Sequence, residues 1–290
     1  VNRGGSKGNN TIQKDYFLPS LNLKYNLNDK NSLRLGASKT YTLPQAKEIS
    51  PYRYVGVNFN SQGNPNLKPS DHYNLDLKWD FNPTPTELIS LTAFYKLIKN
   101  PISRIEVASA GGYLSYENIA DKATVAGVEV EIRKNLFVRP VSNAAHGMNK
   151  LSLGLNGSYI YTNAKMPLAT VTTGSQLEGA APWIVNFDLS HNFTKGERSF
   201  VNTLVLNYVS DKIYTIGTQG YQDIMEQGVL TLDFVSQAKL NKHLSFNLKA
   251  RNLLNSSYKL SRKANENGEK VILNDYKKGI NISLGVSCTF

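Results

Sequence analysis

The most regular feature of the sequence is an alternation of apolar with small or polar residues, which is clearest in the closing segment, residues 279–290. The apolar positions share one parity: Ile280, Ile282, Leu284, Val286, Cys288 and Phe290. Successive side chains of a β-strand point to opposite faces, so this segment is predicted to be a strand with one apolar and one polar face. A helix would scatter the same apolar residues around its circumference.

The same alternation recurs upstream and predicts about eleven amphipathic strands with no convincing helix. The other segments are residues 20–27, 32–41, 72–81, 87–97, 127–133, 151–161, 182–193, 199–210, 229–240 and 244–252. The apolar face of the closing segment is about eleven residues long, which suits a tilted strand that crosses a bilayer, whereas strands of soluble domains average about five or six residues. One such strand alone fits an edge or sandwich strand of a soluble β protein equally well.

The connections between these segments alternate between short and long. Short connections cover residues 28–31, 82–86, 194–198 and 241–243; long ones cover residues 44–70, 99–122, 163–181 and 255–276. Long irregular loops are uncommon in compact soluble domains, whereas short turns on one rim and long loops on the other are typical of outer-membrane barrels. Aromatic residues also gather near strand ends, as in the girdles of such barrels. The pattern therefore predicts an antiparallel transmembrane β-barrel.

Composition and charge argue against two classes of protein, those with transmembrane helices and those that bind nucleic acid. The chain is 40% hydrophobic without a run of eighteen apolar residues, which excludes transmembrane helices. The formal charge is +11, but the basic residues are spread over turns, loops and polar strand faces, so we expect no nucleic-acid partner. The charge could instead meet anionic lipopolysaccharide or a siderophore, or could have no particular partner. The polar opening, VNRGGSKGNNTIQKD, is not a signal peptide and suggests a natural N-terminus further upstream.

Several longer segments resemble one known family. GNPNLKPS (63–70) leads into DHYNLDLKW, and YENIADKATVAGVEVEI (116–132), LEGAAPWIVNFDLSHN (177–192) and ARNLLNSSY (250–258) follow before the aromatic C-terminus. In this order, over nearly the whole chain, they resemble the TonB-dependent outer-membrane receptors in a Bacteroidota-like form.

The resemblance implies a barrel of twenty-two strands filled by an N-terminal plug. This sequence has neither the plug nor a TonB-contacting segment. Residues 1–290 are therefore expected to be the C-terminal part of the barrel, either as a fragment or as one chain of a split assembly. The expected cellular location is the outer membrane of a Gram-negative bacterium, and TonB would act through the missing N-terminal region.

The function that the resemblance implies is uptake of a scarce solute too large for porins, of the siderophore, glycan, peptide or vitamin class. Some relatives also carry a surface lipoprotein lid. A passive porin or adhesin barrel, or a soluble all-β binding module, remains an alternative. Phe290, with Leu284 and Val286 on the same face, resembles the C-terminal signal that the barrel-assembly machinery recognises; the alternative is that Phe290 is a girdle residue.

The sequence predicts no enzyme, metal site or cofactor. His146 and His243 fall in short turns, His191 has the parity of the apolar positions, and His72 is best interpreted as a loop cap. Ligand capture by stacking and hydrogen bonding suits aromatic and basic residues on long loops. The candidates are Tyr52, Arg53, Tyr54, Tyr113 and Tyr116, although packing between loops is an alternative for each.

Overall fold

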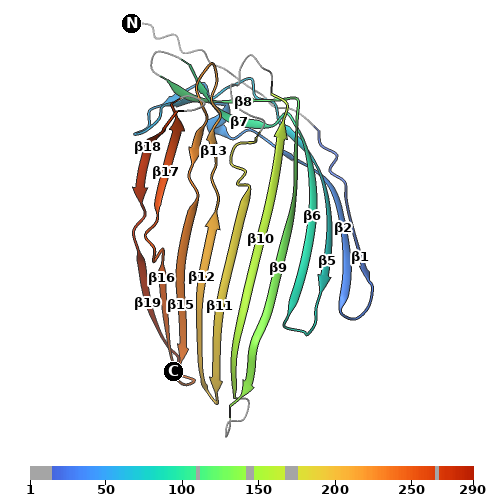
Figure 1. Ribbon diagram of the computed structural model, residues 1–290, viewed down its shortest axis with the longest axis vertical. Coiled ribbons are helices and arrows are strands. Elements are labelled where there is room, and N and C mark those ends of the chain that lie inside the picture. Colours follow the sequence, from blue (N-terminus) through green and yellow to red (C-terminus); the bar gives the residue numbers. More distant parts are fainter. Residues whose placement is uncertain (1–14, 109–111, 142–146, 167–175, 265–267) are drawn as a thin grey trace.

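A computed structural model describes residues 15–108, 112–141, 147–166, 176–264 and 268–290 and is dominated by one antiparallel sheet of eleven strands (Figure 1). The strands lie side by side in the order in which they occur along the chain, so each is paired with the one before it and the one after it. They are β1 (Ser20–Asn26), β2 (Asn31–Thr42), β5 (Ser70–Phe81), β6 (Leu88–Lys99), β9 (Lys122–Pro140), β10 (Met148–Ala164), β11 (Trp183–Lys195), β12 (Arg198–Val209), β15 (Val229–Lys239), β16 (Leu244–Arg251) and β19 (Asn281–Cys288). The predicted strands are all present.

The strand register aligns the apolar positions of neighbouring strands. Leu35 lies opposite Leu23 on β1 and Leu77 on β5, and Leu77 lies opposite Ala93 on β6. The apolar side chains therefore form continuous rows across the sheet. They are largely exposed, with Leu77 at 51% and Leu284 at 78% of their full accessibility, as expected where hydrocarbon rather than protein covers them.

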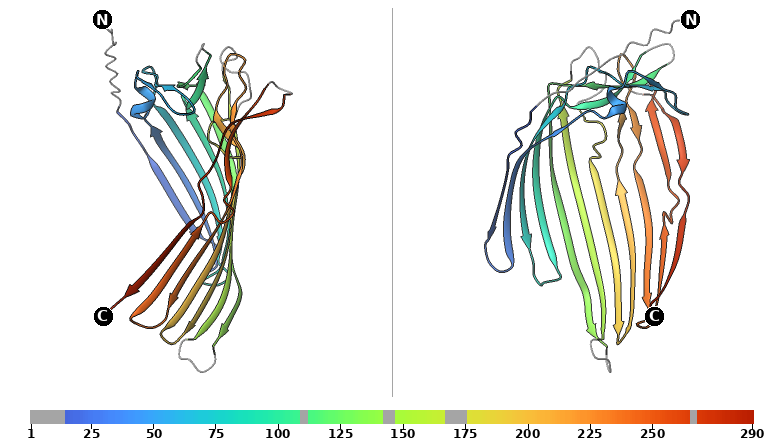
Figure 2. Two further views of the ribbon diagram at one scale, coloured as in Figure 1. Left: turned by 90° about the vertical axis from the view of Figure 1, so that its left-hand side faces the viewer. Right: turned by 180° about the vertical axis from the view of Figure 1, so that it is seen from behind.

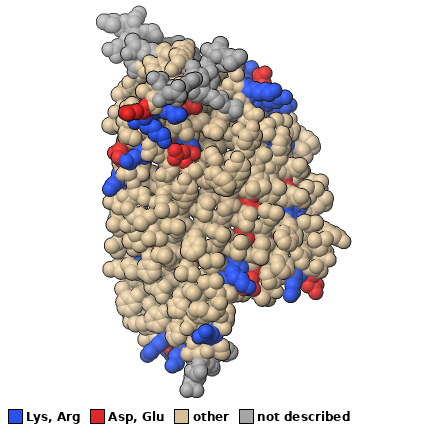
Figure 3. Space-filling view, in the orientation of Figure 1, with Lys and Arg blue, Asp and Glu red and all other residues tan. Residues whose placement is uncertain are grey.

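The sheet is curved into a gutter. In the side view of Figure 2, the edge strands β1 and β19 turn to one side and the middle strands bulge to the other. Figure 3 looks onto the convex face, whose middle band carries few charged residues. The apolar rows thus form the outer surface of a barrel wall.

The opposite face carries charged and amide side chains. Asp80 is 5% exposed and pairs with Arg34 (Nε–Oδ2 3.3 Å) and Lys78 (Nζ–Oδ1 3.5 Å). Further along the same face, the Asn186 amide donates to Asn156 Oδ1 over 3.3 Å. Such a charged, hydrogen-bonded wall suits a water-filled interior.

Two strands exceed their predicted segments by far more than the others do. β9 covers 19 residues and β10 covers 17, against the predicted segments 127–133 and 151–161. A register shift between Leu151 and Ser152 places an extra residue in β9, and the parity of the apolar positions changes beyond it. The alternation therefore ends in the sequence although the strand continues.

The long loops are not irregular. They contain α1 (Ala46–Ile49) and two four-stranded sheets at one end of the gutter (Figure 1). One sheet consists of β3 (Arg53–Tyr54), β4 (Ser61–Gln62), β7 (Ile102–Val107) and β8 (Tyr113–Asn118); the other consists of β13 (Lys212–Thr215), β14 (Ile224–Glu226), β17 (Ser257–Lys263) and β18 (Lys270–Lys277). The sequence did not predict these strands. β3, β4, β13 and β14 have at most four residues, too few for an alternating pattern to stand out, and β18 has three consecutive apolar residues, Val271 to Leu273, instead of an alternation.

The hydrophobic core lies in these loops rather than in the wall. Ile105, Ile119, Leu177, Ile213 and Ile216 are at most 8% exposed and form one cluster. No helix in the described ranges is long and apolar enough to cross a membrane.

Candidate functional site

The two loop sheets meet edge to edge. Ile105 and Ile216 form a parallel bridge, in which Ile216 N–H donates to Arg104 O and Glu106 N–H donates to Ile216 O, both over 3.0 Å. The loops of four different hairpins are thereby joined into one layer, called here the loop layer, at the end of the gutter opposite the short turns.

Arg104 holds the loop layer together at this junction. Its Nη2 donates to Glu178 Oε1 (2.8 Å) and to the carbonyl of Tyr214 (2.6 Å), and its guanidinium lies 3.9 Å from the Tyr214 ring centroid. Glu178 also accepts the backbone N–H of Arg104. Burial raises the pKa of Glu178 above its ordinary value, and the hydrogen bonds and charge of Arg104 oppose that rise. These contacts tie β7 to Glu178 and to β13.

A second ion pair joins the two sheets nearby. Arg262 on β17 pairs with Glu106 on β7, and the Arg262 guanidinium lies 5.3 Å from the Tyr221 ring centroid. The Thr218 hydroxyl donates to the carbonyl of Glu106. The loop layer is therefore fixed by interactions between segments distant in sequence.

The predicted ligand-binding residues are only partly brought together. The Arg53 guanidinium lies 5.5 Å from the Tyr113 ring centroid, whereas Tyr52 is 74% exposed. Tyr54 lies beneath the Lys47 ammonium at 5.5 Å. Tyr116 points to the opposite face of β8 from Tyr113, is half-buried, and has a pKa raised by that burial. Arg53 and Tyr113 thus form a pair, and Tyr116 belongs to the interior of the loop layer.

A cavity of about 310 Å³ opens beside Tyr113. Its lining combines an apolar and aromatic part, Val57 and Phe59, with Asn60 and Glu106 as polar partners. An aromatic ring, amide groups and a carboxylate around a small cavity can stack on and hydrogen-bond a solute. Glu106 was missed by the sequence analysis, because nothing in a short strand distinguishes it from a solvated residue.

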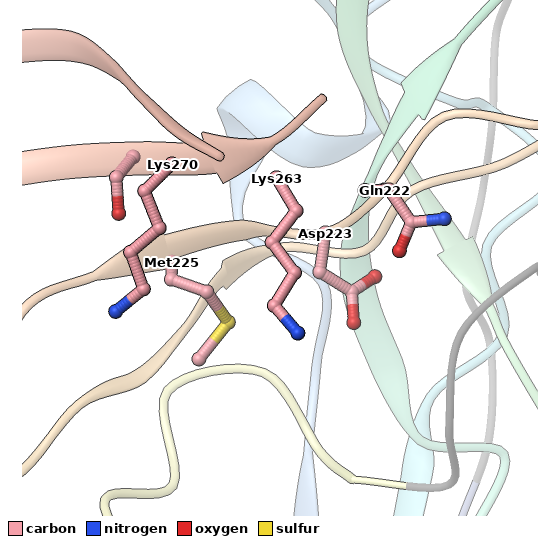
Figure 4. A pocket seen from close by; sticks show the side chains of 6 residues that line it. Gln222, Asp223, Met225, Lys263 and Lys270 are labelled. Carbon is pink, nitrogen blue, oxygen red and sulfur yellow. The ribbon is translucent and has the colours of Figure 1, made fainter. Parts of the chain in front are cut away.

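A second cavity, of about 250 Å³, lies between β14 and the β17–β18 hairpin (Figure 4). Lys263 and Lys270 are register partners on neighbouring strands, and their ammonium groups point the same way. Met225, Asp223 and the buried Ser261 complete the lining. This arrangement suits a small anionic group. Within the described ranges, no cluster of three or more His, Cys, Asp or Glu side chains could hold a metal ion.

Comparisons with known proteins agree with this architecture. A family model described as TonB dependent receptor-like, beta-barrel matches residues 1–253. The iron-regulated outer membrane virulence protein of Vibrio cholerae serotype O1 is 24% identical over 240 residues, which are 79% of this chain and 34% of the relative. The chain thus spans about a third of the length of the curated relatives it matches.

Solved structures of similar fold include receptors and transporters. The ferric enterobactin receptor of Pseudomonas aeruginosa superimposes with a TM-score of 0.58 at 18% identity, over 94% of this chain and 40% of that one. The ferric yersiniabactin uptake receptor of Yersinia pestis gives 0.58 at 15% identity, over 94% and 37% of the two chains. The copper transporter OprC gives 0.61 at 14% identity, over 92% and 38%.

These findings confirm the predicted fold and the predicted location in the outer membrane of a Gram-negative bacterium. An apolar convex wall, a polar concave wall and a folded loop layer are the parts expected of such a barrel. The chain belongs to the TonB-dependent receptor-like β-barrel family.

Proposed function

We propose that this chain is the C-terminal wall and loop portion of a receptor that takes up a scarce, large solute with energy delivered through TonB. The observation that carries the proposal is the loop layer, which presents the Arg53–Tyr113 pair and its cavity at one end of a polar gutter. Proteins of similar fold are named as a ferric enterobactin receptor, a siderophore receptor, a ferric yersiniabactin uptake receptor and a copper transporter, which supports the siderophore class.

In this proposal the loop layer makes the first contact with the solute, by stacking on Tyr113 and by ionic contact with Arg53. The concave wall then offers a hydrated path lined by Asp80, Lys78 and their neighbours. A plug outside this chain would close that path and respond to TonB. The chain would move its ligand without breaking a covalent bond, so we propose no enzymatic activity. The exposed loop layer is also where a surface lipoprotein would sit.

The test is ligand binding and uptake by the complete receptor that carries this chain. Ferric siderophores, copper complexes, glycans, peptides and vitamins are offered as labelled solutes to cells with and without TonB. The double variant Arg53→Ala/Tyr113→Ala is expected to raise the Kd of the accepted solute about tenfold, equivalent to about 1.4 kcal/mol. Lys242→Ala, on the opposite rim, should bind normally. Uptake that persists without TonB would instead support a passive pore.

We further propose that the barrel-assembly machinery recognises Phe290. Thr289 N–H donates to His243 O (2.9 Å) and His243 Nδ1–H donates to Thr289 O (2.7 Å), so the chain is anchored up to Thr289. Phe290 then extends freely, fully exposed, beyond the lipid-facing residues Leu284 and Val286.

Deletion of Phe290 is therefore expected to lower the amount of folded receptor at the cell surface several-fold. The β19 hydrogen bonds would remain, so the loss would lie in assembly rather than in stability. Surface labelling and heat-modifiable migration measure the two quantities separately. Phe290→Tyr, which keeps a terminal aromatic, serves as the control; a normal surface level of the deletion variant would refute the role.

A further inference from the structure

The convex face has a polar interruption in its apolar band near the short-turn rim. His191 lies opposite Asn202 on β12, and Asn202 lies opposite Ser236 on β15. One step closer to the rim, Asn149 on β10 lies opposite Arg139 on β9. By register these five side chains form one contiguous group, called here the polar row.

The polar row occupies positions that are mostly apolar in the neighbouring rows. On the side away from the rim, the next row is Leu153, Leu189, Leu204 and Phe234. Its position on β9 is Lys134, whose ammonium lies 3.0 Å from the Glu87 carboxylate and is therefore already paired. Toward the rim lie Phe193 and Phe200, with ring centroids 6.3 Å apart. The polar row extends from β9 to β15, and neither edge strand, β1 or β19, belongs to it. A further barrel strand would pair with an edge strand and would not cover it.

The hydrogen bonds within the polar row leave donors unused. His191 Nε2–H donates to Asn149 Oδ1 over 2.8 Å, and the Ser236 hydroxyl donates to Asn202 Oδ1 over 2.7 Å. Both asparagine oxygens are therefore engaged, whereas neither amide nitrogen has a hydrogen-bond acceptor in the described part of the chain. Amide donors that face hydrocarbon without an acceptor are costly, so an acceptor-rich group is expected beside them.

The depth of the polar row identifies that group. His191 lies four residues from Lys195, at the short turn, which for a tilted strand is about 10 Å from the rim. The headgroup layer on each side of the hydrocarbon is about 5–8 Å thick. The polar row thus lies where headgroups meet acyl chains on the short-turn side, which in an outer-membrane barrel is the periplasmic leaflet.

The charges select an anionic headgroup. Arg139 is an exposed cation of the polar row, and Lys195, Arg198 and Lys242 are further exposed cations on the same rim, where they outnumber the exposed Glu197 of the β11–β12 turn. The polar row contains no carboxylate, so the ammonium of a zwitterionic lipid would find no partner within it. We infer that the polar row binds the phosphate of an anionic phospholipid of the inner leaflet, such as phosphatidylglycerol.

The inference is tested on the complete receptor in detergent, by native mass spectrometry with short-chain phosphatidylglycerol, phosphatidylethanolamine and lipopolysaccharide. The triple variant Asn149→Leu/His191→Leu/Asn202→Leu gives the polar row the character of its apolar neighbours. It is expected to weaken phosphatidylglycerol binding at least tenfold. Arg139→Gln, at the exposed rim, should weaken it several-fold and abolish the preference over phosphatidylethanolamine. Asn156→Leu, the same change on the polar face of β10, should bind as the unaltered protein does.

Heat-modifiable migration verifies that each variant is folded, and Arg139→Gln keeps the test decisive if the triple variant is not. Unchanged phosphatidylglycerol binding in both variants would overturn the inference. So would equal binding of phosphatidylethanolamine by the unaltered receptor, or a loss confined to lipopolysaccharide, which lies in the outer leaflet. A shift from dimer to monomer in the triple variant would identify a second receptor copy, rather than a lipid, as the occupant.

Discussion

Leu77→Arg is expected to destabilise the barrel by about 2–4 kcal/mol, because it places a charge on the lipid-facing side near the middle of the wall. Leu77 is 51% exposed and lies near the middle of β5, between Tyr73 toward the loop layer and Trp79 toward the short turns. Its neighbours across the sheet are Leu35 and Ala93. An arginine there would carry its charge to the centre of the bilayer without an acid to pair with.

The matched control is Thr92→Arg, which places the same side chain on the polar face at nearly the same depth. Thr92 lies opposite Lys78 and Glu129, so water and a carboxylate are both available to the new charge. Refolding into lipid vesicles across a denaturant series gives both free energies of unfolding, and surface labelling reports assembly in cells. A loss in Thr92→Arg as large as in Leu77→Arg would mean that the two faces are assigned wrongly.

The sequence predicted the wall well because a membrane strand satisfies a simple physical rule. Each strand has lipid on one side and water on the other, so apolar and polar residues alternate along nearly its whole length, as in residues 72–81. The rule fails where geometry intervenes: the register shift beside Leu151 changes the parity of β9, and its last residues could not be recognised.

The loop layer could not be predicted by the same means. Its strands are held by contacts between distant segments: Glu178 is 74 residues from Arg104, and Tyr214 is 110 residues away. No local pattern marks such partners. Arg53, Tyr113 and Tyr116 were candidates because tyrosine and arginine are conspicuous on a loop. That criterion could not show that Arg53 lies over the Tyr113 ring or that Tyr116 points to the opposite face of β8. His191 stood out by its parity, but only the register showed that Asn149 and Asn202 accompany it.

Arg104→Ala is expected to release the loop layer while leaving the wall intact. The change would leave Glu178, whose side chain is 21% exposed, without its cation. It would also remove the side-chain donor that binds the carbonyl of Tyr214. Removing one partner of a largely buried pair costs about 3–5 kcal/mol. Hydrogen exchange and limited proteolysis should therefore show lost protection in β7, β8 and β13, with the wall strands unchanged. Arg53→Ala, which removes only a surface cation–π contact, should cost at most about 1 kcal/mol.

The pH dependence of the Arg104→Ala variant provides a sharper test of this explanation. Burial already holds the pKa of Glu178 above its unfolded value, and loss of Arg104 removes an opposing influence, so the pKa should rise further. The folded layer then binds the proton more tightly than the unfolded chain does. Its stability is greatest below the unfolded pKa and falls as pH rises through the folded one.

Loop protection in Arg104→Ala should consequently recover in part on acidification and be poorest at neutral pH. The double variant Arg104→Ala/Glu178→Gln, which has no carboxylate to titrate at this position, should lack that recovery. If both variants lose protection equally at every pH, the junction at Arg104 depends on packing of the Arg104 side chain against the Tyr214 ring rather than on the buried charge of Glu178.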